Sequence, residues 1–135
     1  ELRFLDAYIF LLKERFDDSL RIELAVPPEV QAHRIVPLSL QMLFENAIKH
    51  NIIASDRPLT IEVFVENAAL VVRNNLQRKK QVMASTRVGL QNIKNRYAFF
   101  SEKEVKVNVT ETCFEVRLPL VESAKTATLA AQRVP

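Results

Sequence analysis

Residues 38–50 have the sequence LSLQMLFENAIKH, in which apolar and polar side chains recur with the period of an α-helix. The apolar side chains form a broad face, made of Leu38, Leu40, Met42, Leu43, Phe44, Ala47 and Ile48. Polar side chains recur on the other side, at Gln41, Glu45, Asn46 and Lys49. The pattern predicts an amphipathic helix that opens at Pro37 and buries its apolar face in a core.

The polar edge of this helix groups a carboxylate, a carboxamide and a cation, at Glu45, Asn46 and Lys49. Magnesium takes oxygen ligands and usually keeps several waters, so the Asn46 side-chain oxygen together with phosphate oxygens can hold it. Glu45 could orient water or neutralise the metal, and Lys49 could approach phosphate as a point charge. Two interpretations stay open at this point, a magnesium nucleotide site and an ordinary solvated helix face.

The flanking sequence supplies further elements. Periodicity predicts helices at residues 2–16 and 89–100, a strand at 20–26, and two hairpins, one from strands 59–65 and 68–73 and one from strands near 105–109 and 114–118. Strands that follow one another without crossover helices favour a mixed or antiparallel sheet with helices on one face. The predicted fold class is therefore α+β, a two-layer α/β sandwich with a mixed, mostly antiparallel sheet.

Composition narrows the class of protein. The chain has 135 residues with 48% hydrophobic content, which fits one domain with a real core. No apolar run approaches the roughly 18 residues that a membrane span requires. Cys113 is the only cysteine, which excludes an internal disulfide, and His33 and His50 show no zinc-ligand spacing. The single glycine, Gly89, excludes the multi-glycine phosphate loops.

Charge is concentrated in one part of the chain. No acidic residue occurs between Glu66 and Glu102, whereas seven basic residues do: Arg73, Arg78, Lys79, Lys80, Arg87, Lys94 and Arg96. We expect a basic loop at residues 74–88 and, near Gly89, a helix N-terminus whose free N–H groups favour an anion. A solvated basic loop and a nucleic-acid footprint are the alternatives. No aromatic residue precedes the helix to stack bases, so we expect no nucleic-acid partner.

Three segments together resemble a known family. Residues 38–50 resemble the N box of integral-membrane sensor histidine kinases that pair with LytTR-type response regulators, and residues 8–16 and 88–97 are similar to two other segments of that family. The matches occur in the right order and span about residues 2–120. The resemblance implies the catalytic ATP-binding domain of the GHKL superfamily, with the Bergerat fold, ATP and Mg²⁺ as cofactors, and a signalling role in a two-component system.

The resemblance also implies roles for individual residues. Asn46 would be the magnesium ligand and, with Glu45, the catalytic group, and Lys49 and His50 would lie beside the nucleotide. Asn74 falls where the family usually has the aspartate that reads the adenine amino group, and Asn75 follows it. Residues 76–88 would form the ATP lid. Gly89 and Leu90 would form the end of the second glycine motif, next to the triphosphate, and Arg87 could contact phosphate in place of backbone amides.

Three positions depart from the family pattern. Asn74 is a carboxamide where a charged acceptor is usual, so it accepts the adenine N–H more weakly. Leu76 stands where a glycine is common, and Arg87 replaces the first glycine of the lid-closing motif. The resemblance therefore leaves two functions open: a protein-histidine kinase domain, and a degenerate nucleotide-binding pseudokinase module that acts by docking to proteins.

Neither His33 nor His50 matches the phosphoacceptor histidine of the family, so we expect transfer to a histidine on an upstream segment. The expected organisation is residues 1–18 as the end of a helical linker, 19–121 as the catalytic domain and 122–135 as a disordered tail. The expected partners are the protein's own upstream helices, a LytTR-type response regulator and, in the full-length protein, a second copy. The expected location is the cytoplasmic side of an inner-membrane protein.

Overall fold

The computed structural model describes residues 2–27, 39–77, 83–100 and 102–120 of the chain. Its elements, in chain order, are α1 (Leu2–Phe16), the 3-10 turn η1 (Asp17–Ser19), β1 (Leu20–Ala25), α2 (Ser39–His50), β2 (Leu59–Glu66), β3 (Ala69–Asn75), α3 (Met83–Phe100), β4 (Lys106–Val109) and β5 (Cys113–Pro119). The order of helices and strands is the one that the sequence predicts. In the described part of the chain, no helix is both long and apolar enough to cross a membrane.

The strands form one five-stranded sheet in the order β1-β2-β3-β5-β4. β1 runs parallel to β2, which requires a crossover connection, and α2 lies in that connection. The other three neighbouring pairs are antiparallel. The predicted mixed, mostly antiparallel sheet is confirmed.

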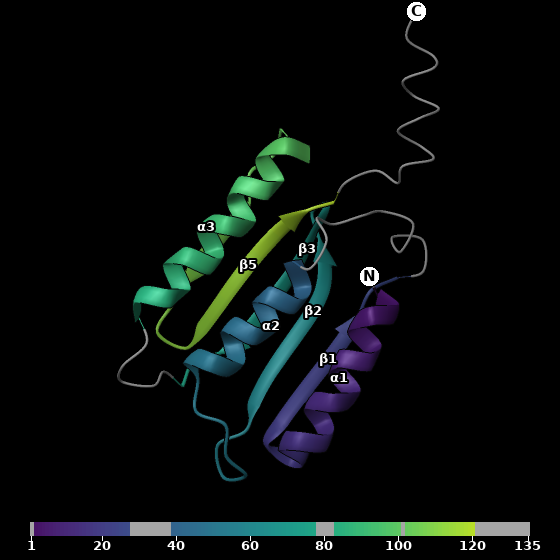
Figure 1. Cartoon of the computed structure of the whole chain (residues 1–135), viewed down its shortest axis with the longest axis vertical. Coiled ribbons are helices and arrows are strands. Elements are labelled where there is room, and N and C mark those ends of the chain that lie inside the picture. The colour runs from purple at the N-terminus through teal and green to yellow at the C-terminus, as the bar shows by residue number, and fades with distance from the viewer. Residues whose placement is uncertain (1, 28–38, 78–82, 101, 121–135) are drawn as a thin grey trace, which may run out of the picture.

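The α-helices lie together over one face of this sheet, with α2 between α1 and α3 (Figure 1). Strand side chains that alternate toward the helices supply much of the core, namely Leu20, Leu59, Ile61, Val63, Leu70, Val72, Val116 and Leu118. The helices add Leu12, Leu40, Leu43, Phe44, Ala47, Ile93 and Tyr97. The two-layer α/β sandwich is therefore confirmed, and α2 is the helix in contact with both of its neighbours.

The opposite face of the sheet carries charged side chains in cross-strand register. Arg73 of β3 lies between Glu62 of β2 and Glu115 of β5. Its Nη2 is 2.9 Å from a Glu62 oxygen, and its Nη1 is 4.0 Å from a Glu115 oxygen. Arg117 pairs with Glu66 at 3.1 Å and with Glu115 of its own strand at 3.2 Å. Arg73 and Arg117 thus each pair with two carboxylates, and they share Glu115.

The first hairpin turns through Asn67 and Ala68. Both residues have positive φ, 50° at Asn67 and 59° at Ala68, which is the backbone of a two-residue type I′ turn. Asparagine tolerates this left-handed region, whereas alanine is disfavoured there because its Cβ approaches the following carbonyl oxygen. The strands on both sides therefore impose an unfavourable conformation on Ala68.

The start of α3 differs from the prediction. α3 begins at Met83, although the sequence predicts a loop through residue 88 and a helix from 89. Gly89 therefore lies inside a helix, beyond the four N–H groups that a helix N-terminus leaves free, and the predicted anion site at its amide is wrong. Residues 83–88 have no clear helical period of apolar side chains, so periodicity does not predict a helix there. The middle of the predicted lid, residues 78–82, and the predicted tail, 122–135, lie outside the described residues.

Strand ends also shift slightly from their predicted positions. β1 ends at Ala25, one residue early, whereas β3 runs on to Asn75, two residues beyond its predicted end. Pairing explains the longer β3, because Asn74 and Asn75 continue the antiparallel ladder with Phe114 and Cys113. The two asparagines that the family resemblance places at the nucleotide are therefore sheet residues.

Candidate functional site

α2 presents two pairs of polar side chains near its C-terminal end. Residues four apart on a helix lie one above the other, so Glu45 stands next to Lys49 and Asn46 next to His50. Glu45 and Lys49 are exposed, whereas Asn46 and His50 are half-buried. The Glu45 carboxylate accepts a hydrogen bond from Gln41 Nε2 at 3.0 Å, one turn earlier. These contacts give the flank of α2 a carboxylate, a carboxamide, an imidazole and an ammonium group.

A small pocket lies between α2 and α3. Its volume is about 170 Å³, and its lining residues are Met42, Leu43, Glu45, Asn46, Lys49, His50, Leu90 and Ile93. Five residues that the sequence analysis assigns to the site line this α2–α3 pocket together: Glu45, Asn46, Lys49, His50 and Leu90. Ligand pockets commonly have volumes of about 300–1,000 Å³, so a nucleoside triphosphate would fill this one and extend past it.

Asn74 and Asn75 do not line the α2–α3 pocket. Asn74 is buried on the helix-facing side of β3, and its Nδ2 donates to the Asn75 carbonyl oxygen at 2.7 Å. The Asn75 side chain is bonded to the start of β2 and to the residue before it, because its Oδ1 accepts from Thr60 N at 2.7 Å and its Nδ2 donates to Pro58 O at 3.2 Å. Asn75 thus uses both ends of its amide within the fold.

Arg87 and Gly89 belong to α3. The orientation of the Arg87 side chain lies outside the described residues, so its predicted contact with phosphate stays a prediction. Leu90, which follows Gly89, lines the α2–α3 pocket together with Asn46. Among the described residues, no group of three His, Cys, Asp or Glu side chains is placed to hold a metal ion.

Two polar residues that the sequence analysis does not single out connect α2 to the end of β3. Asn51, only 3% exposed, directly follows α2, and its Nδ2 donates to Ala47 O at 2.9 Å. Its Oδ1 accepts from Gln77 N at 2.8 Å, and Ile52 N donates to Gln77 O at 2.8 Å. The Gln77 side chain extends this Asn51–Gln77 link by donating to Arg57 O at 2.9 Å. An asparagine just after a helix is a known C-terminal signal, but the partner 26 positions away is set by the fold.

Comparisons with known proteins relate the chain to one class of signalling enzyme. No protein-family model matches it. Over 50 residues it is 36% identical to sensor histidine kinase BtsS of Escherichia coli K12 and, equally, to BtsS of Shigella flexneri. The matched segment is 37% of this chain and 9% of BtsS, so it spans about a tenth of those relatives.

Among solved structures, the histidine kinase AdeS of Acinetobacter baumannii superposes with a TM-score of 0.48 at 12% sequence identity. That superposition covers 86% of this chain and 64% of the AdeS chain. Over the matched 50 residues, the sequence similarity to BtsS relates the chain to sensor histidine kinases.

Proposed function

We propose that this chain is the ATP-binding catalytic domain of a two-component sensor histidine kinase, of the GHKL type. The observation that carries the proposal is the shared pocket of Asn46, Lys49 and Leu90, which joins the N-box-like helix to the helix of the glycine motif. Asn46 and Leu90 are 44 positions apart in the sequence, and both line this pocket. The homology to BtsS supports the same assignment.

The donor set of the pocket fits a magnesium nucleotide. Asn46 supplies a neutral oxygen ligand, and the neighbouring Glu45 carboxylate supplies a charged acceptor for metal-bound water. Lys49 supplies a positive charge for phosphate oxygens, and it lies on the pocket wall one turn from Glu45. When bound, Mg²⁺ would neutralise charge that develops on the phosphates. The role of the chain is then to position groups and to supply electrostatic stabilisation.

The phosphoryl acceptor would be a histidine on another segment of the full-length protein. In this transfer a P–N bond forms at the acceptor imidazole, the bond from the γ-phosphorus to the bridging oxygen breaks, and ADP leaves. Upstream helices, a second copy of the protein and a LytTR-type response regulator are the partners that this assignment proposes. It also proposes that the domain lies on the cytoplasmic side of an inner-membrane protein.

A second function has its own supporting observation. The oxygen and nitrogen of the Asn75 side-chain amide are both hydrogen-bonded, to Thr60 and Pro58, and Asn74 does not line the α2–α3 pocket. A domain with adenine contacts weakened in this way could act as a pseudokinase module that docks proteins without turnover. The two functions differ in whether nucleotide binds.

Thermal unfolding with magnesium and a non-hydrolysable ATP analogue tests the proposal. A ligand at 100 times its Kd, bound only to the folded state, stabilises it by about 2.7 kcal/mol, so Tm should rise by several degrees. Asn46→Ala should abolish the magnesium-dependent part of the rise. Asn92→Ala, at an exposed asparagine of α3 outside the pocket, should keep it. Absence of any rise at millimolar nucleotide would reject the kinase assignment and favour the docking module.

A further inference from the structure

A second cavity lies on the other flank of α2, between that helix and α1. Its volume is about 620 Å³, and its walls are Tyr8, Leu12, Arg15 and Phe16 of α1, Glu45, Ile48 and Lys49 of α2, and Asn51, Ile52 and Ile53 after α2. This volume falls inside the range of about 300–1,000 Å³ that is typical of small-molecule sites. The α1–α2 pocket is thus larger than the α2–α3 pocket and is separated from it by one helix.

The surface of the α1–α2 pocket is mostly apolar. Among its lining residues Leu12 is buried, and Ile48, Ile52 and Ile53 are half-buried. An apolar wall with a few polar groups is the usual composition of a ligand site, because the wall supplies binding energy and the polar groups fix orientation. The apolar body of a small organic molecule would be covered here.

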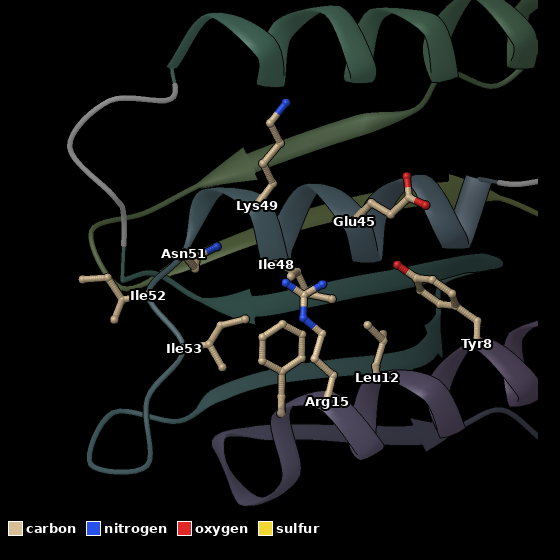
Figure 2. A pocket seen from close by; sticks show the side chains of 10 residues that line it. Tyr8, Leu12, Arg15, Glu45, Ile48, Lys49, Asn51, Ile52 and Ile53 are labelled. Atoms are coloured by element: carbon tan, nitrogen blue, oxygen red, sulfur yellow. The ribbon is translucent and has the colours of Figure 1, made fainter.

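Arg15 is the cation that faces this space. Figure 2 shows its guanidinium between α1 and α2, whereas the Lys49 ammonium points away toward α3. Arg15 Cζ lies 4.9 Å from the centroid of the Phe16 ring, a cation–π contact that holds the side chain at the pocket. The Phe16 ring, which also lines the pocket, therefore favours this position of the exposed Arg15 side chain.

Among the residues that the structure describes, no carboxylate lies within ion-pair distance of Arg15. Arg73 and Arg117 on the open face of the sheet, by contrast, each pair with two carboxylates. Glu45, the carboxylate among the residues that line this pocket, accepts a hydrogen bond from Gln41. Arg15 thus offers five N–H donors in a planar fork, the arrangement that suits a carboxylate or phosphate.

We infer that the α1–α2 pocket is a binding site for a small amphiphilic anion, an apolar body carrying one carboxylate, sulfonate or phosphate group that pairs with Arg15. The apolar body would lie on Leu12, Ile48 and Ile53, and the anionic group would lie at the Phe16 end of α1. The inference does not depend on nucleotide binding, because none of its evidence comes from the α2–α3 pocket.

The first test uses the fluorescent probe 8-anilinonaphthalene-1-sulfonate, which joins an apolar ring system to one sulfonate. It should bind the folded chain saturably, and Arg15→Gln should weaken its affinity by at least about tenfold, since a hydrogen bond to a charged group contributes about 1.5–3 kcal/mol. Lys13→Gln is the matched control, because Lys13 is also an exposed cation in the last turn of α1 but does not line the pocket. Equal affinities of the two variants would overturn the inference.

A second pair of variants separates charge from packing. Ile52→Asp and Ile52→Lys remove the same apolar side chain from the pocket wall and add opposite charges. Probe affinity should fall for the aspartate variant, and the lysine variant should bind the probe at least several-fold more tightly than the aspartate variant. Affinities that fall equally for both would reject an anion site. Thermal melts on each variant show whether it is folded.

Competition identifies the ligand class. Decanoate should displace the probe, whereas 1-decanol, which has the same chain without the charge, should be at least tenfold weaker. Equal displacement by both would show a purely apolar groove and overturn the assignment of Arg15.

Discussion

Replacing Asn51 by alanine should unfold the chain more readily than any exposed polar substitution. Asn51→Ala removes two hydrogen bonds, the one from Asn51 Nδ2 to Ala47 O at 2.9 Å and the one from Gln77 N to Asn51 Oδ1 at 2.8 Å. Losing the hydrogen bond to Ala47 O costs about 1 kcal/mol, and leaving the Gln77 N–H without a partner costs about 1–3 kcal/mol. We therefore expect the free energy of unfolding to fall by roughly 2–4 kcal/mol.

Urea and thermal denaturation followed by circular dichroism measure this loss. For a chain of this size, each kcal/mol lowers Tm by roughly 3–5 °C, so a fall of roughly 6–20 °C is expected. Asn51→Asp separates the two bonds, because it keeps an acceptor for Gln77 N–H and loses the donor to Ala47 O. It should also bury a negative charge, and its stability should therefore fall with rising pH through the carboxyl pKa.

The matched control is Gln91→Ala on α3. It removes one side-chain hydrogen bond, from Gln91 Nε2 to Asn95 Oδ1 at 2.9 Å, at an exposed position. The expected change is below about 0.5 kcal/mol, since surface substitutions of this kind have small effects. If Asn51→Ala proved as mild as Gln91→Ala, the Asn51–Gln77 link would not hold α2 to the end of β3.

Two further predictions concern the hairpin turn and a tyrosine. Ala68→Gly should raise the free energy of unfolding by roughly 1 kcal/mol, because glycine adopts the positive φ of 59° without a Cβ clash, and denaturation with urea would detect it; a loss of stability would argue against the type I′ turn. The pKa of Tyr8 is raised, first by burial and then by the Glu45 charge, with Arg15 acting in the opposite direction. Its contribution to stability is therefore fully present below the unfolded pKa of about 10 and is lost as pH rises through the folded pKa. Tyr8→Phe should remove that part of the alkaline loss of stability. The titration curve of Tyr8, taken as the ultraviolet absorbance of wild type minus that of Tyr8→Phe, should move to lower pH when Glu45 is replaced by Gln. A Tyr8 titration at or below the ordinary tyrosine range would contradict the expected shift.

Much of the fold is predictable from local periodicity. The hairpins at β2–β3 and β4–β5 follow from alternating apolar residues around short polar turns, and α1 and α2 follow from their apolar stripes. α3 shows the limit of this approach. Its first turns, residues 83–88, mix apolar, polar and basic side chains without a helical period, so the sequence alone does not indicate a helix there.

Strand order and polar connections depend on tertiary structure. The parallel pairing of β1 with β2 and the insertion of β5 between β3 and β4 leave no local mark in the sequence. The grouping of Asn46 with Leu90 follows from the family resemblance, which carries information about distant segments. The Asn51–Gln77 link has no such motif, because each residue acquires its role only when the other lies beside it.

Glu45 and Lys49 border cavities on both flanks of α2. A charged occupant of one cavity would therefore alter the electrostatic potential felt by an occupant of the other, across the width of a single helix. Thermodynamic reciprocity requires any such effect on affinity to be equal in both directions. Two chemically different molecules bound on opposite sides of α2 would then change each other's affinity without any rearrangement of the backbone.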